Sequence, residues 1–566
     1  GGDAMTGERF RAVLFDTHDM ILNQYDDYLE ALPLSAGNML INVQKYGTSE
    51  SGESIPTIGQ ETINPLEKMK YIRRTDEGFE IDPTQINIYD TARDRERIKA
   101  YQGNMAPTVG VDKQVITVDR NPDTISAWIK SQDDSKTASE MGIKCIAVYV
   151  DEDADSPHVK AADESFRLPD GGYLDTNAII NAAKQTNAEA IHPGYGFLSE
   201  NAKFARKVKK EKIIWVGPSA HVISVMGDKL KAKELADKAN VPTLTMTSNL
   251  KEASKIGYPL LIKAAAGGGG KGMRVVPSET SLNESLMAAK REAKAGFNDD
   301  RVFFERYIEK SRHIEIQILG DAHGNVVHLG ERECSIQRRH QKIIEESPSP
   351  RISEDTRKKM GSAAIKLAKK IKYQSAGTVE FLLDDDTEEF WFLEVNTRLQ
   401  VEHPITEEVT GIDLVYEQLK IARGEILTYK QDDITFSGHS IEARLYAENP
   451  ENNFLPETGT LIAYDENLEE GARWDSGVES GSVIGTSFDP MLAKVITHAK
   501  TRSDAALKLA KTLESSHIGG VITNRDYLVS ILRSEDFLKG NTTTDFVDRV
   551  ELTKTQNLNQ DQIIPF

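Results

Sequence analysis

Two stretches of the sequence contain residue types that suit phosphate chemistry. The first is KAAAGGGGKGM at 263–273, in which a run of glycines lies between Lys263 and Lys271. Glycine loses more conformational freedom on folding than any other residue, so a run of glycines is costly. Unhindered backbone N–H groups can approach phosphate oxygens, and the lysines supply positive charge. The stretch therefore predicts a phosphate-binding loop, with a flexible surface hairpin as the alternative.

The second stretch, AGTVEFLLDDDTEEFWFLEVNTR at 376–398, predicts a β-hairpin with an acidic turn. Pairing of its two strands places Glu380 opposite Glu394, with Asn396 one alternation further along the same face. Two facing carboxylates repel each other, and burial strengthens the repulsion. A Mg²⁺ or Mn²⁺ ion between them would remove it and bridge phosphate oxygens. An arginine partner, such as the nearby Arg398, is the alternative.

Together the two stretches indicate phosphoryl transfer, which depends on positioning and on charge neutralisation. The glycine run lacks the pattern GxxxxGK[ST], which excludes a P-loop fold. The first strand–helix turn lacks G-x-G-x-x-G, which argues against a dinucleotide-binding fold.

Strands and helices alternate in the part of the sequence that precedes these stretches. Strands are predicted at 114–118, 143–150, 188–194 and 212–217, with a helix at 177–187. This alternation favours a parallel sheet with helices on both faces. From about residue 437 strands dominate, including MLAKVITHA at 491–499, and a helix follows. One further strand is predicted at 10–16.

The composition is that of a soluble globular protein, with 39% hydrophobic and 28% charged residues. Its 566 residues suggest three to five domains of about 150 residues each. The formal net charge of −20 argues against general binding to nucleic acid or to anionic membranes. No apolar run reaches the ~18 residues of a membrane helix, and no secretory signal is visible. With two cysteines, the chain suits a reducing compartment, so we expect a cytoplasmic location, or an organelle matrix if a transit peptide was removed.

Several segments resemble the biotin carboxylases, which are the ATP-grasp ligases of biotin-dependent carboxylases, across roughly 141–549. The segments are AIHPGYGFLSEN (190–201), MGDKLKAK (226–233), KAAAGGGGKGM (263–273), RHIEIQ (312–317), GERECSIQRRHQKIIEESPSP (330–350), FLEVNTRLQVEHPITE (392–407), GHSIEARLYAENP (438–450) and FDPMLAK (488–494). SIQRRHQK and NTRLQVEHP are the most specific, because other ATP-grasp enzymes lack them.

The resemblance implies an α/β multidomain fold. Its expected parts are an unrecognised N-terminal region (1–110), a Rossmann-like pre-ATP-grasp domain (111–228), an ATP-grasp domain (229–436) with a glycine-rich lid around 245–310, a β-rich biotin carboxylase C-terminal domain (437–550) and a polar tail (551–566). The family's opening strand and Asn-Arg-Gly-Glu-Ile-Ala turn are missing, and residues 114–134 stand in their place. We expect residues 1–110, which contain no matched motif, to serve assembly, folding or regulation.

For ATP and its metal ion, the resemblance implies roles position by position. The ATP-binding residues would be Lys229, Lys263, Gly268, Gly269 and Gly270 at the phosphates, Glu305, Arg306 and Ile308 at the adenine, and His313, Gln337 and His340 at the ribose and phosphates. The ligands of Mg²⁺ or Mn²⁺ would be Glu380, Glu394 and Asn396, the residues that the hairpin pattern also indicates.

For the carboxylation chemistry, the resemblance implies a bicarbonate site next to a general base. The bicarbonate site would consist of Lys342, Arg398, Gln400 and the backbone of Val401. Glu402 would be the general base, and Arg444 would stabilise the biotin enolate. A solvated basic face around Lys342 and a surface carboxylate at Glu402 are the alternatives that the residues alone leave open.

The implied function is ATP-dependent carboxylation of biotin with bicarbonate, the first half-reaction of a biotin-dependent, acyl-CoA or related, carboxylase. The sequence has no Ala-Met-Lys-Met motif and no carboxyltransferase region, so biotin is expected on a carrier protein or domain and not on this chain. The expected partners are that carrier, a carboxyltransferase and a second copy of the chain. An ATP-grasp ligase that joins a carboxylate to an amine is the alternative enzyme, and NTRLQVEHP argues against it. A non-catalytic scaffold would have lost ligands, whereas every matched residue is present.

Overall fold

The computed structural model describes residues 72–75, 78–81, 126–128, 132–169, 171–265, 273–297, 299–338, 341–466 and 471–550. The chain divides into two compact units, residues 1–121 and 122–566. In the first unit, strands β1 (Ile72–Thr75) and β2 (Gly78–Ile81) form an antiparallel pair. The strands predicted at 10–16 and 114–118, the glycines 268–270, His340 and the tail at 551–566 lie outside the described residues.

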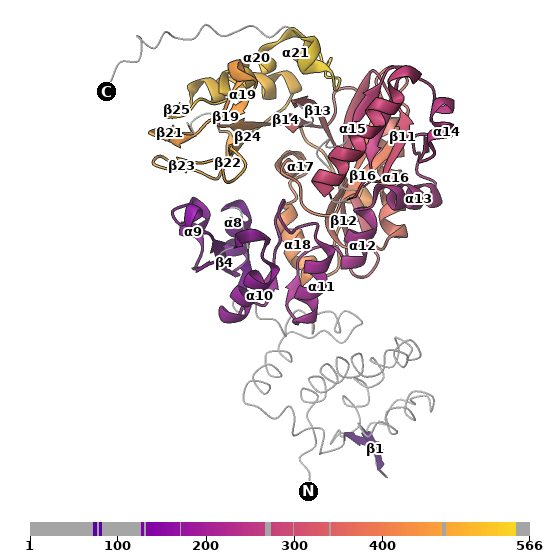
Figure 1. The fold of residues 1–566 in the computed structure, drawn as a ribbon. Helices are drawn as coiled ribbons and strands as arrows, with labels where there is room; N and C mark the ends of the chain where they lie inside the picture. The colour runs from indigo at the N-terminus through magenta and orange to yellow at the C-terminus, as the bar shows by residue number, and fades with distance from the viewer. Residues whose placement is uncertain are drawn as a thin grey trace. The chain divides into compact units, whose positions relative to one another are not determined.

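The second unit begins with a five-stranded parallel sheet in the order β5-β4-β3-β6-β7. Figure 1 labels β4 of this sheet. Its strands are β3 (Ser126–Trp128), β4 (Lys144–Tyr149), β5 (Glu164–Arg167), β6 (Ala190–Ile191) and β7 (Ile214–Trp215), and the helices of this part are α8 (Gln132–Glu140), α9 (Pro157–Ala161), α10 (Thr176–Gln185), α11 (Ala202–Lys210) and α12 (Ala220–Met226). The predicted parallel sheet is confirmed. Its central strand β3 lies within 114–134, the segment that replaces the family's usual opening.

An eight-stranded antiparallel sheet forms the centre of the second unit, in the order β16-β15-β12-β13-β14-β17-β24-β22. Its strands are β12 (Ser311–Gly320), β13 (Val326–Arg338), β14 (Gln341–Ser347), β15 (Ser375–Asp384), β16 (Phe390–Asn396), β17 (His439–Tyr446), β22 (Arg473–Ser476) and β24 (Met491–Ala499). The predicted hairpin is β15–β16, and the strand predicted at 491–499 is β24. Strand β14 pairs directly with β17, so the sheet continues past residue 436 and joins residues that are distant in sequence.

A smaller four-stranded sheet, in the order β10-β9-β11-β8, lies in the region of the predicted lid. Its strands are β8 (Met246–Thr247), β9 (Leu260–Ala264), β10 (Arg274–Val276) and β11 (Val302–Arg306), and its helices are α14 (Leu250–Ala253) and α15 (Glu279–Phe297). Helix α15 lies along this sheet (Figure 1) and buries Leu282, Ala289 and Ala293 with apolar side chains of β9 and β11. Strands β9 and β11 position Lys263 and Glu305.

Helices pack against the strands of the eight-stranded sheet. They are α13 (Lys229–Lys238), α16 (Glu354–Lys370), α17 (His403–Thr410) and α18 (Leu414–Ala422). Asp228 caps α13 by accepting hydrogen bonds from the first-turn N–H groups of Leu230 and Lys231. Helix α17 has Pro404 in its first turn. Gly411 follows its last residue as the C-cap, with a φ of 70° in the left-handed region that favours glycine. The start of the helix is thereby fixed directly after Glu402.

The C-terminal part adds helices and short strands beside β17 and β24. They are α19 (Arg502–Ser515), α20 (Arg525–Arg533), α21 (Glu535–Leu538) and α22 (Phe546–Arg549), with β18 (Glu448–Asn449), β19 (Leu455–Pro456), β20 (Gly459–Thr460), β21 (Ala463–Asp465), β23 (Val483–Ile484) and β25 (His517–Gly519). Helix α19 packs Leu509 and Leu513 into the same core as Ile441 and Val495 of the sheet. Apolar burial therefore holds β17, and with it Arg444, in place.

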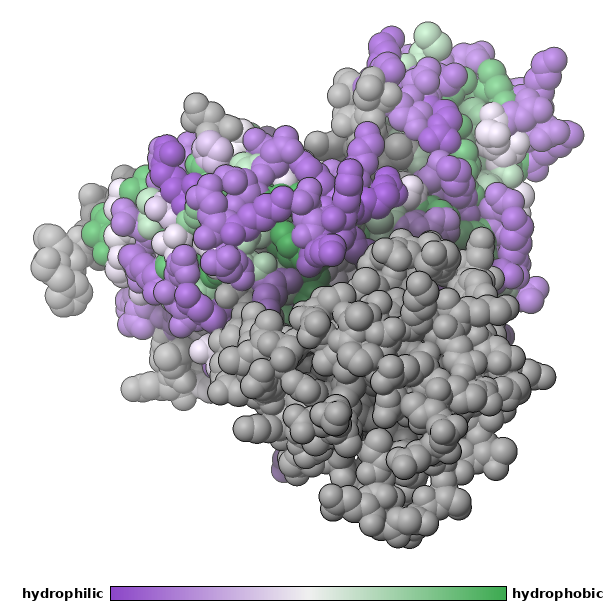
Figure 2. Space-filling view, turned by 90° about the horizontal axis from the view of Figure 1, so that it is seen from below, coloured by the Kyte–Doolittle hydropathy of each residue, from purple (hydrophilic) through white to green (hydrophobic). Residues whose placement is uncertain are grey.

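The coloured surface in Figure 2 is mostly hydrophilic, with hydrophobic residues in small, scattered groups. This agrees with the charged fraction of 28%. Among the described residues, no helix combines the length and the apolar character that a membrane crossing needs.

Candidate active site

A row of charged side chains crosses four adjacent strands of the large sheet. Glu394 on β16 pairs with Glu380 on β15, and Glu380 pairs with Glu315 on β12. Glu315 in turn pairs with Arg332 on β13. Directly paired residues of antiparallel strands share one face of the sheet. The predicted opposition of Glu380 and Glu394 is confirmed, and Glu315 and Arg332, which the sequence did not single out, extend the row.

Donor groups surround the buried carboxylate of Glu380. They are Asn396 Nδ2 at 2.8 Å, Lys342 Nζ at 3.1 Å and Gln400 Nε2 at 3.1 Å from Oε1, and His313 Nε2 at 3.1 Å from Oε2. Burial raises the pKa of Glu380, but the charges of Lys342 and His313 outweigh burial and hold the pKa well below its usual value. Glu380 is therefore anionic across the physiological pH range.

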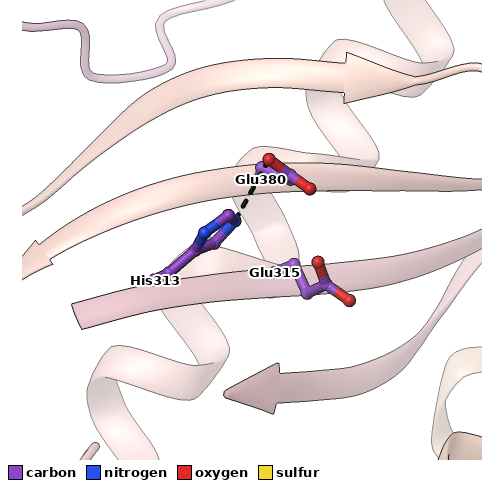
Figure 3. A group of neighbouring side chains, drawn as sticks. All are labelled: His313, Glu315 and Glu380. Atoms are coloured by element: carbon purple, nitrogen blue, oxygen red, sulfur yellow. Dashed lines mark ion pairs between the residues drawn. The ribbon is translucent and has the colours of Figure 1, made fainter. Parts of the chain in front are cut away.

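The side-chain atoms of His313, Glu315 and Glu380 that could ligate a metal ion lie within 4.8 Å of one another (Figure 3). Figure 3 shows His313 and Glu315 on one strand and Glu380 on the neighbouring strand, with His313 directed at Glu380. The predicted metal ligands share only Glu380 with this group. The carboxylate of Glu394 contacts Lys229 Nζ at 3.2 Å, and Asn396 lies on the same face. Carboxylate and amide oxygens are the donors that Mg²⁺ and Mn²⁺ prefer, so the residues fit such an ion.

Lys342 on β14 connects three carboxylates. Its ammonium nitrogen lies 2.6 Å from Glu402 Oε1, 2.7 Å from Glu315 Oε2 and 3.1 Å from Glu380 Oε1. Burial lowers the pKa of Lys342, but the surrounding acidic groups outweigh it and hold the pKa well above its usual value. The structure thus brings the predicted bicarbonate lysine, the predicted base and a predicted metal ligand into direct contact.

Glu402 lies at the N-terminus of α17 and is 2% exposed. Its Oε2 accepts a hydrogen bond of 2.8 Å from Arg444 Nη2, while its Oε1 faces Lys342. Burial raises the pKa of Glu402, but Lys342, Arg444 and Arg332 outweigh burial and hold the pKa well below its usual value. The carboxylate is therefore ionised, and the alternative of an exposed surface carboxylate is wrong.

Arg444 on β17 is held between two carboxylates. Its Nε donates to Glu345 Oε1 at 2.6 Å, and its Nη2 donates to Glu402 Oε2 at 2.8 Å. Burial and the charge of Glu402 raise the pKa of Glu345 to about 7, against the opposing effect of Arg444. Arg444 is not a solvent-facing arginine, because its side chain is 10% exposed and two of its nitrogens contact carboxylates.

The other predicted bicarbonate residues lie in the segment between β16 and α17. Arg398 Nη2 donates to Asn396 Oδ1 at 3.2 Å, and its Nε donates to Glu200 Oε2 at 3.2 Å. Gln400 is 3% exposed and donates to Glu380. Val401 follows in the turn that leads into α17. Arg398 and Gln400 therefore contact predicted metal ligands, and Val401 directly precedes the predicted base.

The predicted phosphate lysines are paired with carboxylates in this structure. Lys229 at the start of α13 contacts Glu394, and Lys263 on β9 lies 3.2 Å from Glu305 Oε2. The other oxygen of Glu305 pairs with the buried Lys233. Both oxygens of the predicted adenine residue Glu305 therefore face lysines.

The remaining nucleotide residues follow the same strands. Ile308 is buried after β11, and the exposed Arg306 stacks over the ring of Trp391 at 6.0 Å. Gln337 Nε2 lies 2.8 Å from His313 Nδ1, so these two predicted neighbours are in contact. His340 and Gly268–Gly270 lie outside the described residues, and their assignment stays a prediction.

Two buried residues outside the charged row, His192 and Cys334, have surroundings typical of structural residues. His192 is 1% exposed, its Nε2 lies 3.1 Å from Gln418 Oε1, and its Nδ1 accepts from the backbone N–H of Gly194. Cys334 is 0% exposed, and burial raises the pKa of its thiol well above the usual value. A protonated, buried thiol is a poor nucleophile.

Glu442 on β17 is the Cα partner of Glu345 and is completely buried. Within the described part of the chain, neither of its carboxylate oxygens has a hydrogen-bond partner. Burial raises the pKa of Glu442 well above its usual value, Lys494 opposes this shift, and Glu345 adds to it. Burial and the charge of Glu345 therefore favour the protonated form of Glu442 in the folded chain.

We expect Glu442→Gln to raise the midpoint of thermal unfolding, Tm, at neutral pH. A glutamate of the unfolded chain ionises above its pKa of about 4.3, whereas the raised pKa of Glu442 lets the folded chain keep this proton to a higher pH. The free energy of unfolding therefore falls as pH rises, by up to about 1.4 kcal/mol per unit, until the pH reaches the raised folded pKa. Glutamine mimics the protonated carboxyl group without this loss. Calorimetry from about pH 5 to about pH 8 measures the difference.

The neighbouring Glu346 provides a control of opposite sign. Burial raises its pKa, but Arg502 and His439 outweigh burial and lower the pKa to about 2. Its carboxylate therefore stabilises the folded chain above a pH of about 4.3, and Glu346→Gln should lower Tm over the same range. If Tm of Glu442→Gln follows that of the parent at every pH, Glu442 is ionised and the argument fails.

Three family models match the chain. They are "Biotin carboxylase, N-terminal domain" at residues 134–223, "Carbamoyl-phosphate synthase L chain, ATP binding domain" at 228–430 and "Biotin carboxylase C-terminal domain" at 442–549. Biotin carboxylase 2 of Bacillus subtilis (strain 168) is 45% identical over 424 residues, which cover 73% of this chain and 95% of that protein. The mitochondrial propionyl-CoA carboxylase alpha chain of Homo sapiens is 46% identical, but the match spans only 59% of that longer chain.

Solved structures agree with these matches. The biotin carboxylase domain dimer of the Hydrogenobacter thermophilus 2-oxoglutarate carboxylase, in complex with MgADP, ADP and bicarbonate, aligns with a TM-score of 0.73 at 40% identity, covering 75% of this chain and 97% of that chain. A biotin carboxylase–β,γ-ATP complex from Campylobacter jejuni has the same TM-score and identity, and the match covers 75% of this chain and 98% of that chain. On these matches, with the ATP-grasp sheet and the charged row that it positions, the chain belongs to the biotin carboxylase family.

Proposed function

We propose that this chain carboxylates biotin on a carrier protein, using ATP and bicarbonate, through carboxyphosphate. The observation that carries the proposal is the contact of Lys342 with Glu402 and Glu380, with Arg444 bonded to the far oxygen of Glu402. The ammonium group of Lys342 and the guanidinium group of Arg444 thereby lie on either side of the ionised carboxylate of Glu402. Membership in the biotin carboxylase family supports this assignment.

The first step activates bicarbonate. A bicarbonate oxygen attacks the γ-phosphorus of ATP, a P–O bond forms, and ADP leaves with the electron pair of the broken P–O bond. Lys342 and Arg398 hold the bicarbonate anion, since the planar Arg398 fork suits a carboxylate-like group. Glu402 accepts the bicarbonate proton. Bicarbonate bound at Lys342 would compete with Glu402 for this cation, which would weaken one of the charges that lower the pKa of Glu402.

On the phosphate side, Lys229, Lys263 and the 263–273 loop hold the triphosphate of ATP. Lys229 and Lys263 then exchange their carboxylate partners Glu394 and Glu305 for phosphate oxygens. Glu380, Glu394 and Asn396 would hold Mg²⁺ or Mn²⁺, which when bound neutralises phosphate charge. Release of Glu394 from Lys229 frees that carboxylate for the ion.

The second step transfers the carboxyl group. Carboxyphosphate divides into CO₂ and phosphate, and the phosphate takes the proton from N1′ of biotin. N1′ then attacks CO₂, forming the C–N bond of carboxybiotin. Arg444 stabilises the negative charge that develops on the ureido oxygen, as donors do in an oxyanion hole. Closure of the lid, which residues around 245–310 form, would exclude water from the labile intermediate.

The expected organisation follows from this chemistry. The pre-ATP-grasp (111–228), ATP-grasp (229–436) and C-terminal (437–550) regions are proposed as the catalytic domains. The positions of the family-model matches support these ranges. The biotin carrier, the carboxyltransferase of an acyl-CoA or related carboxylase, and a second copy of this chain are the proposed partners. We propose the cytoplasm or an organelle matrix as the location.

The proposed function is tested by the release of ADP from ATP by the purified chain. We expect cleavage to require bicarbonate and to accelerate when free biotin is added. ATP cleavage at the same rate without bicarbonate, measured in CO₂-depleted buffer, would contradict the proposal.

We expect Glu394→Gln to weaken the use of the divalent ion. The substitution removes one of two facing carboxylates, so the Mg²⁺ concentration for half-maximal ADP release should rise by at least about tenfold. Asp386→Asn in the exposed turn of the same hairpin is the matched control, since Asp386 pairs only with the exposed Lys310 in the described structure. An unchanged metal requirement in Glu394→Gln would remove Glu394 from the metal site.

A further inference from the structure

Arg332 on β13 makes hydrogen bonds with all of its donors. The side chain is 0% exposed, and a guanidinium has five N–H groups in a rigid, planar fork. The acceptors are Glu315 Oε1 at 2.5 Å from Nε, Gln317 Oε1 at 2.6 Å and Thr406 Oγ1 at 3.0 Å from Nη1, and Thr378 Oγ1 at 3.0 Å and Gln400 Oε1 at 2.8 Å from Nη2. One side chain therefore fixes groups on β12, β15, α17 and the segment before α17.

We propose that Arg332 is a positioning residue of the bicarbonate pocket, which sets the orientation of Gln400, the charge available on Lys342 and the place of helix α17. The proposal rests on the proposed function, because it assumes that Gln400, Lys342 and Glu402 act on bicarbonate. Arg332 itself lies beneath these groups and has no exposed atom with which to touch the substrate.

The first consequence concerns the amide of Gln400. Arginine only donates hydrogen bonds, so the Gln400 atom that faces Arg332 must be the carbonyl oxygen. The amide nitrogen then faces Glu380, at 3.1 Å, on the side away from Arg332. Gln400 therefore presents N–H groups, which suit an anion such as bicarbonate. Without Arg332 the amide is free to turn and present its oxygen, which repels an anion.

The second consequence concerns the charge of Lys342. Glu315 gives one oxygen to Arg332 and the other to Lys342. Because Arg332 neutralises Glu315, the positive charge of Lys342 remains available to Glu402, Glu380 and an incoming anion. Without Arg332, Glu315 would hold the Lys342 ammonium more tightly, since an unpaired buried carboxylate is costly.

The third consequence concerns the position of the base. Thr406 lies one turn after Glu402, and its hydroxyl accepts from Arg332 Nη1. This bond ties the first turns of α17 to the sheet that carries Lys342. The charge of Arg332 also lowers the pKa of Glu402, together with those of Lys342 and Arg444.

The test compares two buried arginines on opposite faces of one sheet. Arg312 on β12 is 1% exposed and donates to Glu333, Asp385, Thr542 and the carbonyl of Gly540, none of which is a proposed catalytic residue. Lysine retains the charge but not the fork. We expect Arg332→Lys to raise the KM for bicarbonate at least about tenfold at saturating ATP, with the KM for ATP changed less than twofold. Arg312→Lys should lower Tm without changing the KM for bicarbonate.

Thr378→Val provides a milder variant that keeps the shape and leaves all charges in place. It removes the second acceptor of Arg332 Nη2, so the KM for bicarbonate should rise about threefold or more. Equal KM values for bicarbonate in the parent, Arg332→Lys and Thr378→Val would overturn the positioning role while leaving the proposed function intact. A parent chain without bicarbonate-dependent ATP cleavage would instead overturn the proposed function.

Discussion

Glu402→Gln is expected to abolish bicarbonate-dependent ATP cleavage, with a loss of at least about 10²-fold in kcat. Glutamine keeps the shape of the side chain but accepts no proton from bicarbonate. In the structure, both oxygens of Glu402 face cations, Lys342 and Arg444, so the amide also places N–H groups against these donors. ADP release at saturating bicarbonate, with ATP binding measured separately by calorimetry, gives the result.

A control on the same helix separates the role of the base from a general effect of the substitution. Glu408 on α17 is partly exposed and lies 3.9 Å from Arg473, away from Lys342. Glu408→Gln should therefore cleave ATP like the parent. If Glu402→Gln binds ATP and retains bicarbonate-dependent cleavage, another group accepts the proton.

Arg444→Ser is expected to separate the two steps. Carboxybiotin formation should fall by on the order of 10²–10³, because the charge on the ureido oxygen loses its guanidinium donor. ATP cleavage with bicarbonate should fall much less, since Glu402 keeps its contact with Lys342 and the charge of Arg332. The measurement is ADP release and carboxybiotin in the same reaction at fixed bicarbonate.

The control for Arg444→Ser is Arg502→Ser. Arg502 pairs with Glu346, the neighbour of Glu345 on β14. This ion pair is about as buried as that of Arg444 with Glu345, and Arg502 contacts no proposed catalytic residue. This variant should lose stability but retain the ratio of carboxybiotin to ADP. Parallel loss of both activities in Arg444→Ser, with ATP still bound, would remove the case for separate roles.

The parts of the site that the sequence predicted are those that local patterns determine. Glu380 and Glu394 lie on one hairpin, so the two strands and the acidic turn indicate that they face each other. A register irregularity between Glu380 and Phe381, which the sequence did not predict, is also needed to bring Glu394 opposite Glu380. Motifs supplied the base and the bicarbonate residues, and contacts among Lys342, Glu402 and Arg444 agree with that grouping.

The parts that the sequence did not predict depend on the pairing of distant strands. Glu315 and Arg332 meet because β12 pairs with β13 across a register irregularity between Ile316 and Ile318. Glu345 reaches Arg444 because β14 pairs with β17. Neither register follows from alternation within a single strand, since a shift by one residue turns each side chain to the other face. The motif RHIEIQ contains Glu315, and the motif GERECS contains Arg332, but neither motif shows that the two residues pair.

The central claim, that bicarbonate carbon is transferred to biotin, is tested most directly with isotopically labelled bicarbonate. The purified chain is incubated with ATP, Mg²⁺, labelled bicarbonate and biotin, and acid-labile label on biotin is measured together with ADP. The account predicts labelled carboxybiotin that requires both ATP and Glu402, and that is lost in Arg444→Ser while ADP release persists. ATP cleavage that never places label on biotin, or that proceeds equally without bicarbonate, would contradict it.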